Sequence, residues 1–287
     1  MTLEFAASLF LLAAGASALG GALGMASGIF IVPLLTVFAG IGIHTAIAAS
    51  IVSVIAWSIG GAATFLRVGL TNLRVAIVLE TATTAGALAG VLLIGVFPVS
   101  ALFFLFAAIL LLSARQMMAR RREPEAAEII SDGRDWASRL DLHASYPDQA
   151  GGREIAYRVG RVPLALALMF GAGLVSALLG IGSGVLKIPA MDTALRLPIK
   201  VSSATSNFMI GVTAAASGVA YFARGDIDPA IAGPVAVGSV IGALLGARFL
   251  IAVPGDRLRL LFVAVLLVLA AQMLLSAFGI DLRGHAA

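Results

Sequence analysis

Eight long apolar runs constrain this chain more than any other feature of its sequence. Most of them reach the ~20 residues that an α-helix needs to cross the hydrocarbon core of a bilayer. They occupy residues 3–38, 43–66, 73–96, 99–119, 162–195, 199–222, 230–252 and 257–279. The runs are continuous and rich in Ala, Leu and Gly, whereas the strands of a membrane β-barrel alternate apolar and polar residues over ~10 positions. The sequence therefore predicts an all-α polytopic membrane protein.

Composition narrows the classes of function. The chain has no cysteine, which excludes disulfides, thiolate metal ligands and a thiol nucleophile. It has no GxxxxGK[ST] phosphate-binding loop, which excludes an ATP-driven pump within this chain. Nine Lys and Arg residues lie between Arg115 and Arg161, but eight acids are interleaved with them. Because that segment is nearly neutral, we expect no binding of nucleic acid.

Shifting the sequence along itself by 156 residues brings identical residues together without a gap. The matches include Ser27–Gly28 with Ser183–Gly184, Pro33 with Pro189, Ser50 with Ser206, Gly86 with Gly242, and Pro98 with Pro254. A register kept over this length predicts two homologous membrane repeats, 1–118 and 162–287, joined by a polar linker, 119–161. The first run is expected to belong to the fold rather than to a signal peptide, because it carries Glu4 where a signal has basic residues.

Each repeat begins with an apolar run that glycines interrupt. The two interruptions are GMASGIFIVP, Gly24–Pro33, and GIGSGVLKIP, Gly180–Pro189. Secondary transporters are built from such repeats, and their substrates bind near the middle of the membrane, where interrupted helices meet. The second part of an interrupted helix exposes amide N–H groups at its start, and these attract anions. The pattern therefore predicts an anion site at the two interruptions.

The distribution of Lys and Arg predicts how the repeats are oriented. We expect the linker in the cytoplasm, because loops on that side carry an excess of Lys and Arg. If each first run crossed the membrane once, five bases of the second repeat would lie outside: Arg196, Lys200, Arg248, Arg257 and Arg259. If each first run instead folds back at its glycines as a hairpin, these five become cytoplasmic and only Arg224 and Arg283 remain outside. The charges thus favour inverted repeats of about four hydrophobic segments each, the first of each a glycine-interrupted hairpin.

A further set of motifs recurs in both repeats. In the second repeat they are the Gly-rich break that ends at Pro189, the pair Thr205–Ser206, Tyr221 four residues before Gly225, and a GxxxG helix at Gly242 and Gly246. The first repeat matches less closely, because Ala26 and Ala49 stand where the second has Gly182 and Thr205. This pattern resembles the sulfite exporter TauE/SafE family over both repeats.

The resemblance implies a multi-pass permease of the bacterial inner membrane. It would export a small sulfur oxyanion, such as sulfite or an organosulfonate, by alternating access, without a cofactor and without enzymatic chemistry. The partners implied are the lipid bilayer and a small anionic substrate. The residues leave open a permease for another small anion or metabolite.

Two serines and two glycines at the interruptions are candidate substrate-binding residues. Ser27 and Gly28 lie in the first interruption, and Ser183 and Gly184 lie in the second. The hydroxyls and the N–H groups that follow them can hold an oxyanion together. The alternative is that each serine bonds to a carbonyl of its own helix and lets helices pack closely. The recurrence of the pair at equivalent positions favours binding.

A polar cluster in the second repeat supplies further candidates. The sequence KVSSATSNF places Thr205, Ser206 and Asn207 within one turn and a half of a helix, so this face must contact protein or water. Ser50 is the counterpart of Ser206 in the first repeat. We assign all four to the substrate site. The alternative is that such clusters only join helices.

Three charged residues within the apolar runs are considered for a role in transport. Lys187 lies three residues after Gly184 and either lines the anion path or extends its ammonium to the interface. Glu80 and Asp192 are candidates for proton exchange, and the interpretation we favour is that both lie near the interface and are solvated.

Two other classes of function remain to be weighed. An intramembrane hydrolase needs a base beside its serine. His44, the one histidine in an apolar run, is the second residue of that run and is expected to lie in a loop. A membrane scaffold or sensor would act through the linker, which has few apolar positions and no recognisable domain. The GxxxG motifs Gly86–Gly90 and Gly242–Gly246 predict faces for helix packing.

Overall fold

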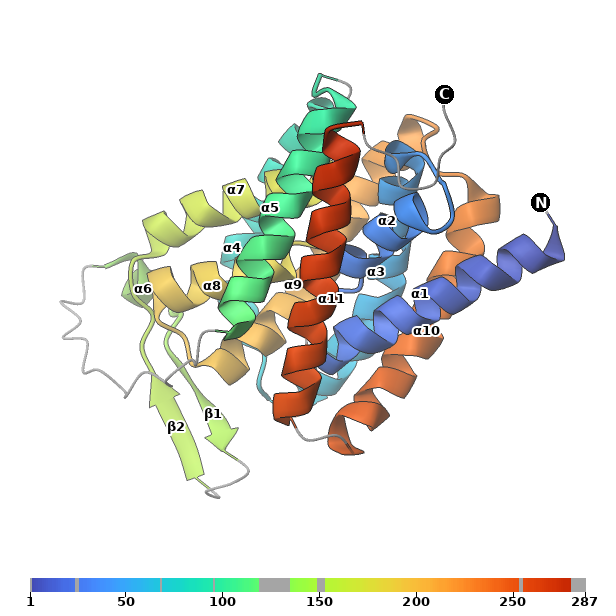
Figure 1. Ribbon diagram of the computed structural model, residues 1–287. Helices are drawn as coiled ribbons and strands as arrows, with labels where there is room; N and C mark the ends of the chain where they lie inside the picture. The colour runs from blue at the N-terminus through green and yellow to red at the C-terminus, as the bar shows by residue number, and fades with distance from the viewer. Residues whose placement is uncertain are drawn as a thin grey trace.

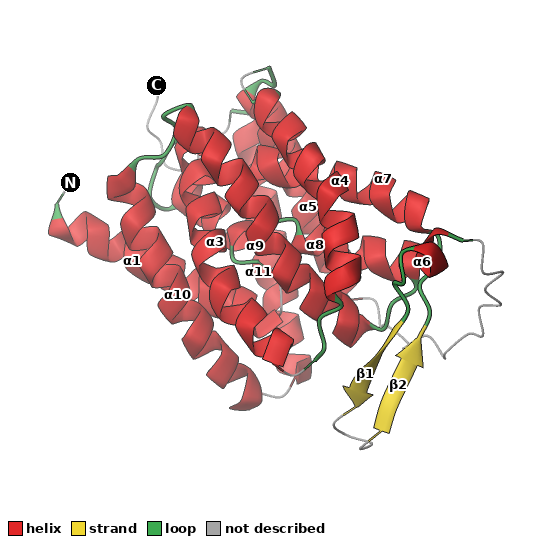
Figure 2. Cartoon of the chain, turned by 180° about the vertical axis from the view of Figure 1, so that it is seen from behind, coloured by secondary structure: helices red, strands yellow, loops and turns green. Residues whose placement is uncertain are grey.

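The chain forms a bundle of long helices with a small β-hairpin at one end (Figures 1 and 2). The structure is a computed structural model that describes residues 2–23, 26–67, 69–94, 96–118, 135–148, 153–252 and 255–279. The first repeat forms α1 (Leu3–Leu23), α2 (Gly28–Val37), α3 (Ile43–Arg67), α4 (Leu73–Leu92) and α5 (Val99–Met118). The linker holds α6 (Trp136–Arg139), β1 (Ala144–Asp148) and β2 (Arg153–Tyr157). The second repeat forms α7 (Val162–Leu179), α8 (Gly184–Ala190), the π-helical η1 (Met191–Leu195), α9 (Ile199–Ala223), α10 (Pro229–Ala252) and α11 (Gly255–Ala277).

The most extensive helix contacts join one repeat to the other. Helix α1 lies along α10, α4 along α7, α3 against α9, and α5 beside α11 (Figure 1). The main apolar core, which includes Phe30, Ile47, Phe106 and Leu179, draws its buried side chains from both repeats. Neither half therefore buries its apolar faces without the other.

The GxxxG motifs lie where helices come closest. A Cβ added at Gly86 would overlap the backbone carbonyl of Phe170 on α7, and one added at Gly90 would lie 2.5 Å from the carbonyl oxygen of Leu174. In the other pair, a Cβ at Gly242 would overlap the carbonyl of Ala14 on α1. The packing role predicted for these three glycines is confirmed. The surroundings of Gly246 lie outside the described residues.

The helix is interrupted in the first apolar run of each repeat. Helix α1 ends at Leu23 and α2 begins at Gly28, while α7 ends at Leu179 and α8 begins at Gly184. Gly24 and Met25 of the first interruption lie outside the described residues. At the end of the second segment, Gly160 N–H donates to the Leu195 carbonyl at 3.1 Å. The chain therefore enters α7 and leaves η1 at the same end of the bundle.

The linker contains regular structure that was not predicted from the sequence. Strands β1 and β2 pair antiparallel, from Ala144 opposite Tyr157 to Asp148 opposite Arg153. Three apolar linker side chains, Ala137, Leu142 and Val159, are buried in a second cluster with residues of α4, α7, η1 and α9. This hairpin adds a β element to a chain that is otherwise helical, and the linker segment 119–134 lies outside the described residues.

Within the described residues, two helices are long and apolar enough to cross a membrane by length and composition alone. These are α4 and α7. Shorter apolar stretches lie in α1, α2, α3, α5, α10 and α11. The largely helical architecture expected from the apolar runs is thus present.

Candidate functional site

The two interruptions face each other inside the bundle. Ser50 Oγ on α3 donates to the carbonyl oxygen of Gly180 at 2.8 Å, which ties the first repeat to the second interruption. A Cβ at Gly28, where α2 begins, would overlap the same Gly180 carbonyl and lie 2.9 Å from Ser50 Oγ. Glycine is therefore required at position 28 by the close approach of the other interruption.

This meeting point lies at the middle of the two long helices α3 and α9. A Cβ added at Gly182 would lie 2.7 Å from Ala26 Cβ, 2.9 Å from Val54 Cγ1 and 3.4 Å from Ile210 Cγ2. Val54 and Ile210 are each the twelfth of the 25 residues in their helix. The interruptions are therefore about as far from one end of the bundle as from the other.

The backbone of the second interruption is strained at Ser183. Its φ of 53° is left-handed, a conformation that costs a residue with a Cβ about 1 kcal/mol or more. The Ser183 carbonyl accepts from Leu186 N at 2.9 Å and from Lys187 N at 2.8 Å, which starts α8. The equivalent Ser27 has a helical φ of −60°. Strain of this kind is typical of functional segments.

Four buried polar atoms in the second interruption and in α9 have no hydrogen-bond partner within the described structure. They are Ser183 Oγ, Ser202 Oγ, Ser206 Oγ and Asn207 Oδ1. All four side chains are at most 2% exposed. A buried polar group that makes no hydrogen bond costs about 1 to 3 kcal/mol, so four of them in the second interruption and the neighbouring helix α9 point to a polar ligand. Three further such atoms, in Ser17, Thr71 and Gln272, belong to other segments.

The remaining candidate hydroxyls already have partners. Ser27 Oγ lies 3.5 Å from Ser53 Oγ on α3, which accepts from Ser239 Oγ on α10 at 2.9 Å. Thr205 Oγ1 accepts from the backbone N–H of Asn72 at 3.1 Å. The structure therefore places Ser27, Gly28, Ser50, Ser183 and Gly184 at the interruptions, and it places Thr205 against the loop before α4.

Lys187 is buried in an ion pair that the sequence interpretation missed. Its Nζ lies 3.3 Å from Glu80 Oε2, and it also donates to Thr213 Oγ1 on α9. Glu80 is 7% exposed, and its Oε1 accepts from Thr213 and from Thr84. The expectation of a solvated Glu80 near the interface is wrong, because the carboxylate compensates a cation that is itself fully buried. The sequence could have predicted this ion pair, because a single acid and a single base buried in two apolar runs must pair if neither contacts water. Asp192 lies half-buried in η1.

Comparison with known protein families places this chain in one of them. The sequence model described as "Sulfite exporter TauE/SafE" matches residues 9–273, which include both interruptions and the linker. The chain belongs to the sulfite exporter TauE/SafE family. The resemblance drawn from the motifs is therefore confirmed.

Two relatives of this TauE/SafE protein come from Bacillus subtilis (strain 168). One, "Probable membrane transporter protein YdhB", is 26% identical over 229 residues, which are 80% of this chain and 84% of the relative. The other, "Probable membrane transporter protein YunE", is 28% identical over 111 residues, 39% of this chain and 41% of the relative. No solved structure matches the chain. Together with the family assignment, these matches identify a membrane transporter.

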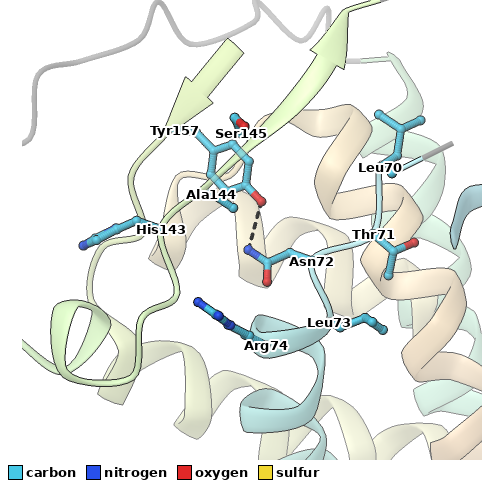
Figure 3. A pocket seen from close by; sticks show the side chains of 10 residues that line it. Leu70, Thr71, Asn72, Leu73, Arg74, His143, Ala144, Ser145 and Tyr157 are labelled. Atoms are coloured by element: carbon cyan, nitrogen blue, oxygen red, sulfur yellow. Dashed lines mark hydrogen bonds between the residues drawn. The ribbon is translucent and has the colours of Figure 1, made fainter. Parts of the chain in front are cut away.

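A polar pocket lies beside the linker, away from the interruptions (Figure 3). It has a volume of about 270 Å³, and its walls are Gly69–Arg74 of the α3–α4 loop with His143, Ala144, Ser145 and Tyr157 of the linker. Asn72 is central: Nδ2 donates to the Leu142 carbonyl at 3.0 Å and to Tyr157 Oη at 2.9 Å, while Oδ1 accepts from Val75 N at 3.0 Å. Burial raises the pKa of Tyr157, and the hydrogen bond from Asn72 opposes this rise only in part. Asn72 thus fastens the linker of the TauE/SafE chain to the start of α4.

Proposed function

We propose that this TauE/SafE protein is a secondary transporter that exports a small sulfur oxyanion, such as sulfite or an organosulfonate, by alternating access. The single observation that carries the proposal is the group of four unpartnered buried polar atoms at and near the second interruption. Ser183 Oγ, Ser202 Oγ and Ser206 Oγ each bring a hydroxyl donor. The amide of Asn207 brings N–H donors once it is turned about its last torsion. An oxyanion accepts from such donors through several oxygens at once.

The geometry also supports a moving site. The interruptions touch, because the approach of Gly28 to the Gly180 carbonyl leaves no room for a methyl group. An anion can therefore bind between them only when they part. A relative movement of the two repeats provides that separation, and it is the motion by which transporters built from repeats expose a central site to each side in turn.

We further propose that the two repeats are inverted with respect to each other in a bacterial inner membrane, with the linker in the cytoplasm. The helix contacts are unchanged when the repeats are exchanged: α1 with α10 becomes α7 with α4, while α3 with α9 and α5 with α11 map onto themselves. The hydrogen bond from Gly160 to Leu195 supports a fold-back of the segment α7–α8–η1. Arg74, which pairs with Asp141 of the linker, and Arg196, which follows η1, lie at the linker end, as the excess of positive charge in the cytoplasm requires.

The proposal is tested by sulfite flux in liposomes that contain purified protein. Sulfite, an organosulfonate and sulfate are offered separately, with the wild-type chain beside Ser206→Ala and Asn207→Ala. Each variant removes one hydrogen bond to a charged ligand, which is worth about 1.5 to 3 kcal/mol, so we expect the half-saturating concentration to rise roughly tenfold to a hundredfold.

Ser113→Ala is the matched control. Ser113 is also a buried serine, but its hydroxyl donates to the Ile109 carbonyl of its own helix α5 at 2.6 Å. We expect this variant to keep the wild-type half-saturating concentration. Equal values in the wild type, Ser206→Ala and Asn207→Ala would assign the α9 cluster to helix packing. If sulfate or the organosulfonate is transported and sulfite is not, the proposed substrate is wrong, but the proposed binding site is retained.

A further inference from the structure

A buried cluster of one base, one acid and two threonines lies beside the proposed anion site. Lys187 on α8, Glu80 and Thr84 on α4, and Thr213 on α9 form it. Lys187 is fully buried, and Thr213 is 1% exposed. The backbone N–H of Lys187 donates to the carbonyl of Ser183 at 2.8 Å, so the cluster begins one helical turn from the strained residue of the second interruption.

A buried ion pair is by itself weak evidence for a role in stability. Burying two charges costs several kcal/mol per ion, and apolar side chains of similar size often stabilise a protein as well or better. The equivalent positions at the offset of 156 residues carry apolar residues instead: Ile31 and Trp57 correspond to Lys187 and Thr213, and Ala236 corresponds to Glu80. The pair therefore occurs in only one of two similar environments, which points to a function rather than to packing.

The hydrogen bonds of the cluster fit both a charged and a neutral Glu80. Thr213 Oγ1 has one proton, and two acceptors lie within reach: Glu80 Oε1 and the Met209 carbonyl, the latter at 3.0 Å. If Glu80 gains a proton, it can donate to Thr213, whose own proton then turns to Met209. No side chain has to change its position for this exchange.

Lys187 keeps a donor for a ligand. An ammonium has three N–H groups, and within the described residues Nζ has two acceptors, Glu80 Oε2 and Thr213 Oγ1. Once Glu80 is neutral, the positive charge of Lys187 is no longer compensated. A buried cation is expensive in a membrane, so an anion at the adjacent interruption then becomes the favoured counter-ion.

Few other charges act on the cluster. The described elements packed around it are α3, α4, α7, α8, η1 and α9. Their remaining charged or titratable side chains are His44 and Arg67 at the two ends of α3, together with Arg74, Asp192, Lys200 and Tyr221. Arg74 pairs with Asp141 at the linker end, and the Tyr221 hydroxyl donates to the Ala177 carbonyl at 2.9 Å. The hydrogen bonds and the ion pair of Glu80 are those with Lys187, Thr213 and Thr84.

We propose that Glu80 is a proton-binding site that couples proton movement to anion transport, with Lys187 shared between the Glu80 carboxylate and the substrate anion. A proton from solution binds a carboxylate oxygen of Glu80, and the released Lys187 then balances one negative charge of the anion. Proton and anion therefore travel in the same direction. This inference rests on the proposed anion transport, and it adds the coupling ion and the residue that carries it.

The test compares the number of protons with the number of sulfite ions moved. Proteoliposomes with an internal pH-sensitive dye and radiolabelled sulfite report both fluxes at once, with no pH gradient at the start. We expect wild-type protein to acidify the compartment that sulfite enters, and Glu80→Gln to lower the ratio of protons to sulfite at least tenfold. Glu154→Gln, at an exposed linker position, is the control and should keep the wild-type ratio. An unchanged ratio in Glu80→Gln would overturn the coupling.

Glu80→Gln removes the counter-ion of Lys187, and a protein with an uncompensated buried charge can fail to fold. A second variant tests the proposal in that case. The double variant Glu80→Gln with Lys187→Gln restores neutrality in the cluster. It should also move sulfite without protons, and with an affinity at least tenfold lower. Proton movement at the wild-type ratio in this double variant would equally overturn the proposal.

A measurement that does not need transport separates the two proposals. Infrared difference spectra of purified protein, titrated with acid in the absence of sulfite, should show the C=O band of a protonated carboxyl group that is missing in Glu80→Gln. If this band is present and wild-type protein moves neither sulfite nor protons, the proposed substrate fails and the proton site stands. Identical spectra for both proteins would refute protonation of Glu80.

Discussion

Replacing Gly28 with alanine should push the two interruptions apart. The new methyl group would overlap the Gly180 carbonyl, lie 2.9 Å from Ser50 Oγ and lie 3.0 Å from Ile181 Cα. Two of these three neighbours are backbone atoms, so the strain cannot be relieved by turning a side chain. The hydrogen bond from Ser50 to Gly180 would be stretched by the same movement.

The size of the effect follows from these two losses. Inserting a methyl group into a packed site costs about 1 to 3 kcal/mol, and a lost hydrogen bond adds about 0.5 to 1.5 kcal/mol. At roughly 2 to 4 °C per kcal/mol, a total of about 2 to 4 kcal/mol lowers the melting temperature by roughly 4 to 16 °C. The assay is thermal unfolding of the purified protein in detergent, with and without sulfite.

Two other glycines serve as controls for Gly28→Ala. At Gly184 the added Cβ would lie 2.6 Å from Ile210 Cδ1, the far end of a flexible side chain that can move away. At Gly15 no atom lies within 4 Å of the added Cβ, and alanine in mid-helix is about 0.5 to 1 kcal/mol better than glycine. We expect the melting temperatures to rank Gly15→Ala highest and Gly28→Ala lowest. The apposition of the two interruptions would be refuted if Gly28→Ala melted at or above Gly184→Ala.

Three further predictions test the topology, the linker and the helix packing. A cysteine introduced in the 196–200 loop, in a chain with no other cysteine, should react with an impermeant maleimide from the cytoplasmic side, and reaction from outside alone would exclude inverted repeats. Asn72→Ala removes the N-cap of α4 and two hydrogen bonds to the linker. A protease should therefore cut the β1–β2 hairpin of the linker faster than in the wild type. An unchanged rate of cleavage would contradict the attachment of the linker to α4 through Asn72. In Gly173→Ala the new methyl group would overlap the carbonyl of Thr83, so the yield of folded protein should fall. In the control Gly171→Ala the methyl group meets no atom within 4 Å, so the yield should stay at the wild-type level. Equal yields of the two variants would refute the close contact between α4 and α7.

Several parts of the site could be predicted from the sequence because they depend on local chemistry or on self-similarity. Glycines followed within a few residues by a proline disfavour a continuous helix, so GMASGIFIVP and GIGSGVLKIP marked the two breaks. The offset of 156 residues added that Ser27 and Ser183, and likewise Ser50 and Ser206, hold equivalent positions. The repeat did not predict that equivalent serines have different surroundings: Ser50 bonds to the second interruption, whereas Ser206 has no partner among the described residues.

The sequence by itself determined that this chain is helical, because long apolar runs in lipid can satisfy their backbone hydrogen bonds only within a helix. Tertiary structure alone decided the partners, since Glu80 and Lys187 are 107 residues apart and no periodicity relates them. It also decided that Thr205 supports the loop before α4, through Asn72 at a separation of 133 residues. Local composition fixes which face of a helix must avoid lipid, but the packing of the helices determines which polar group it meets there.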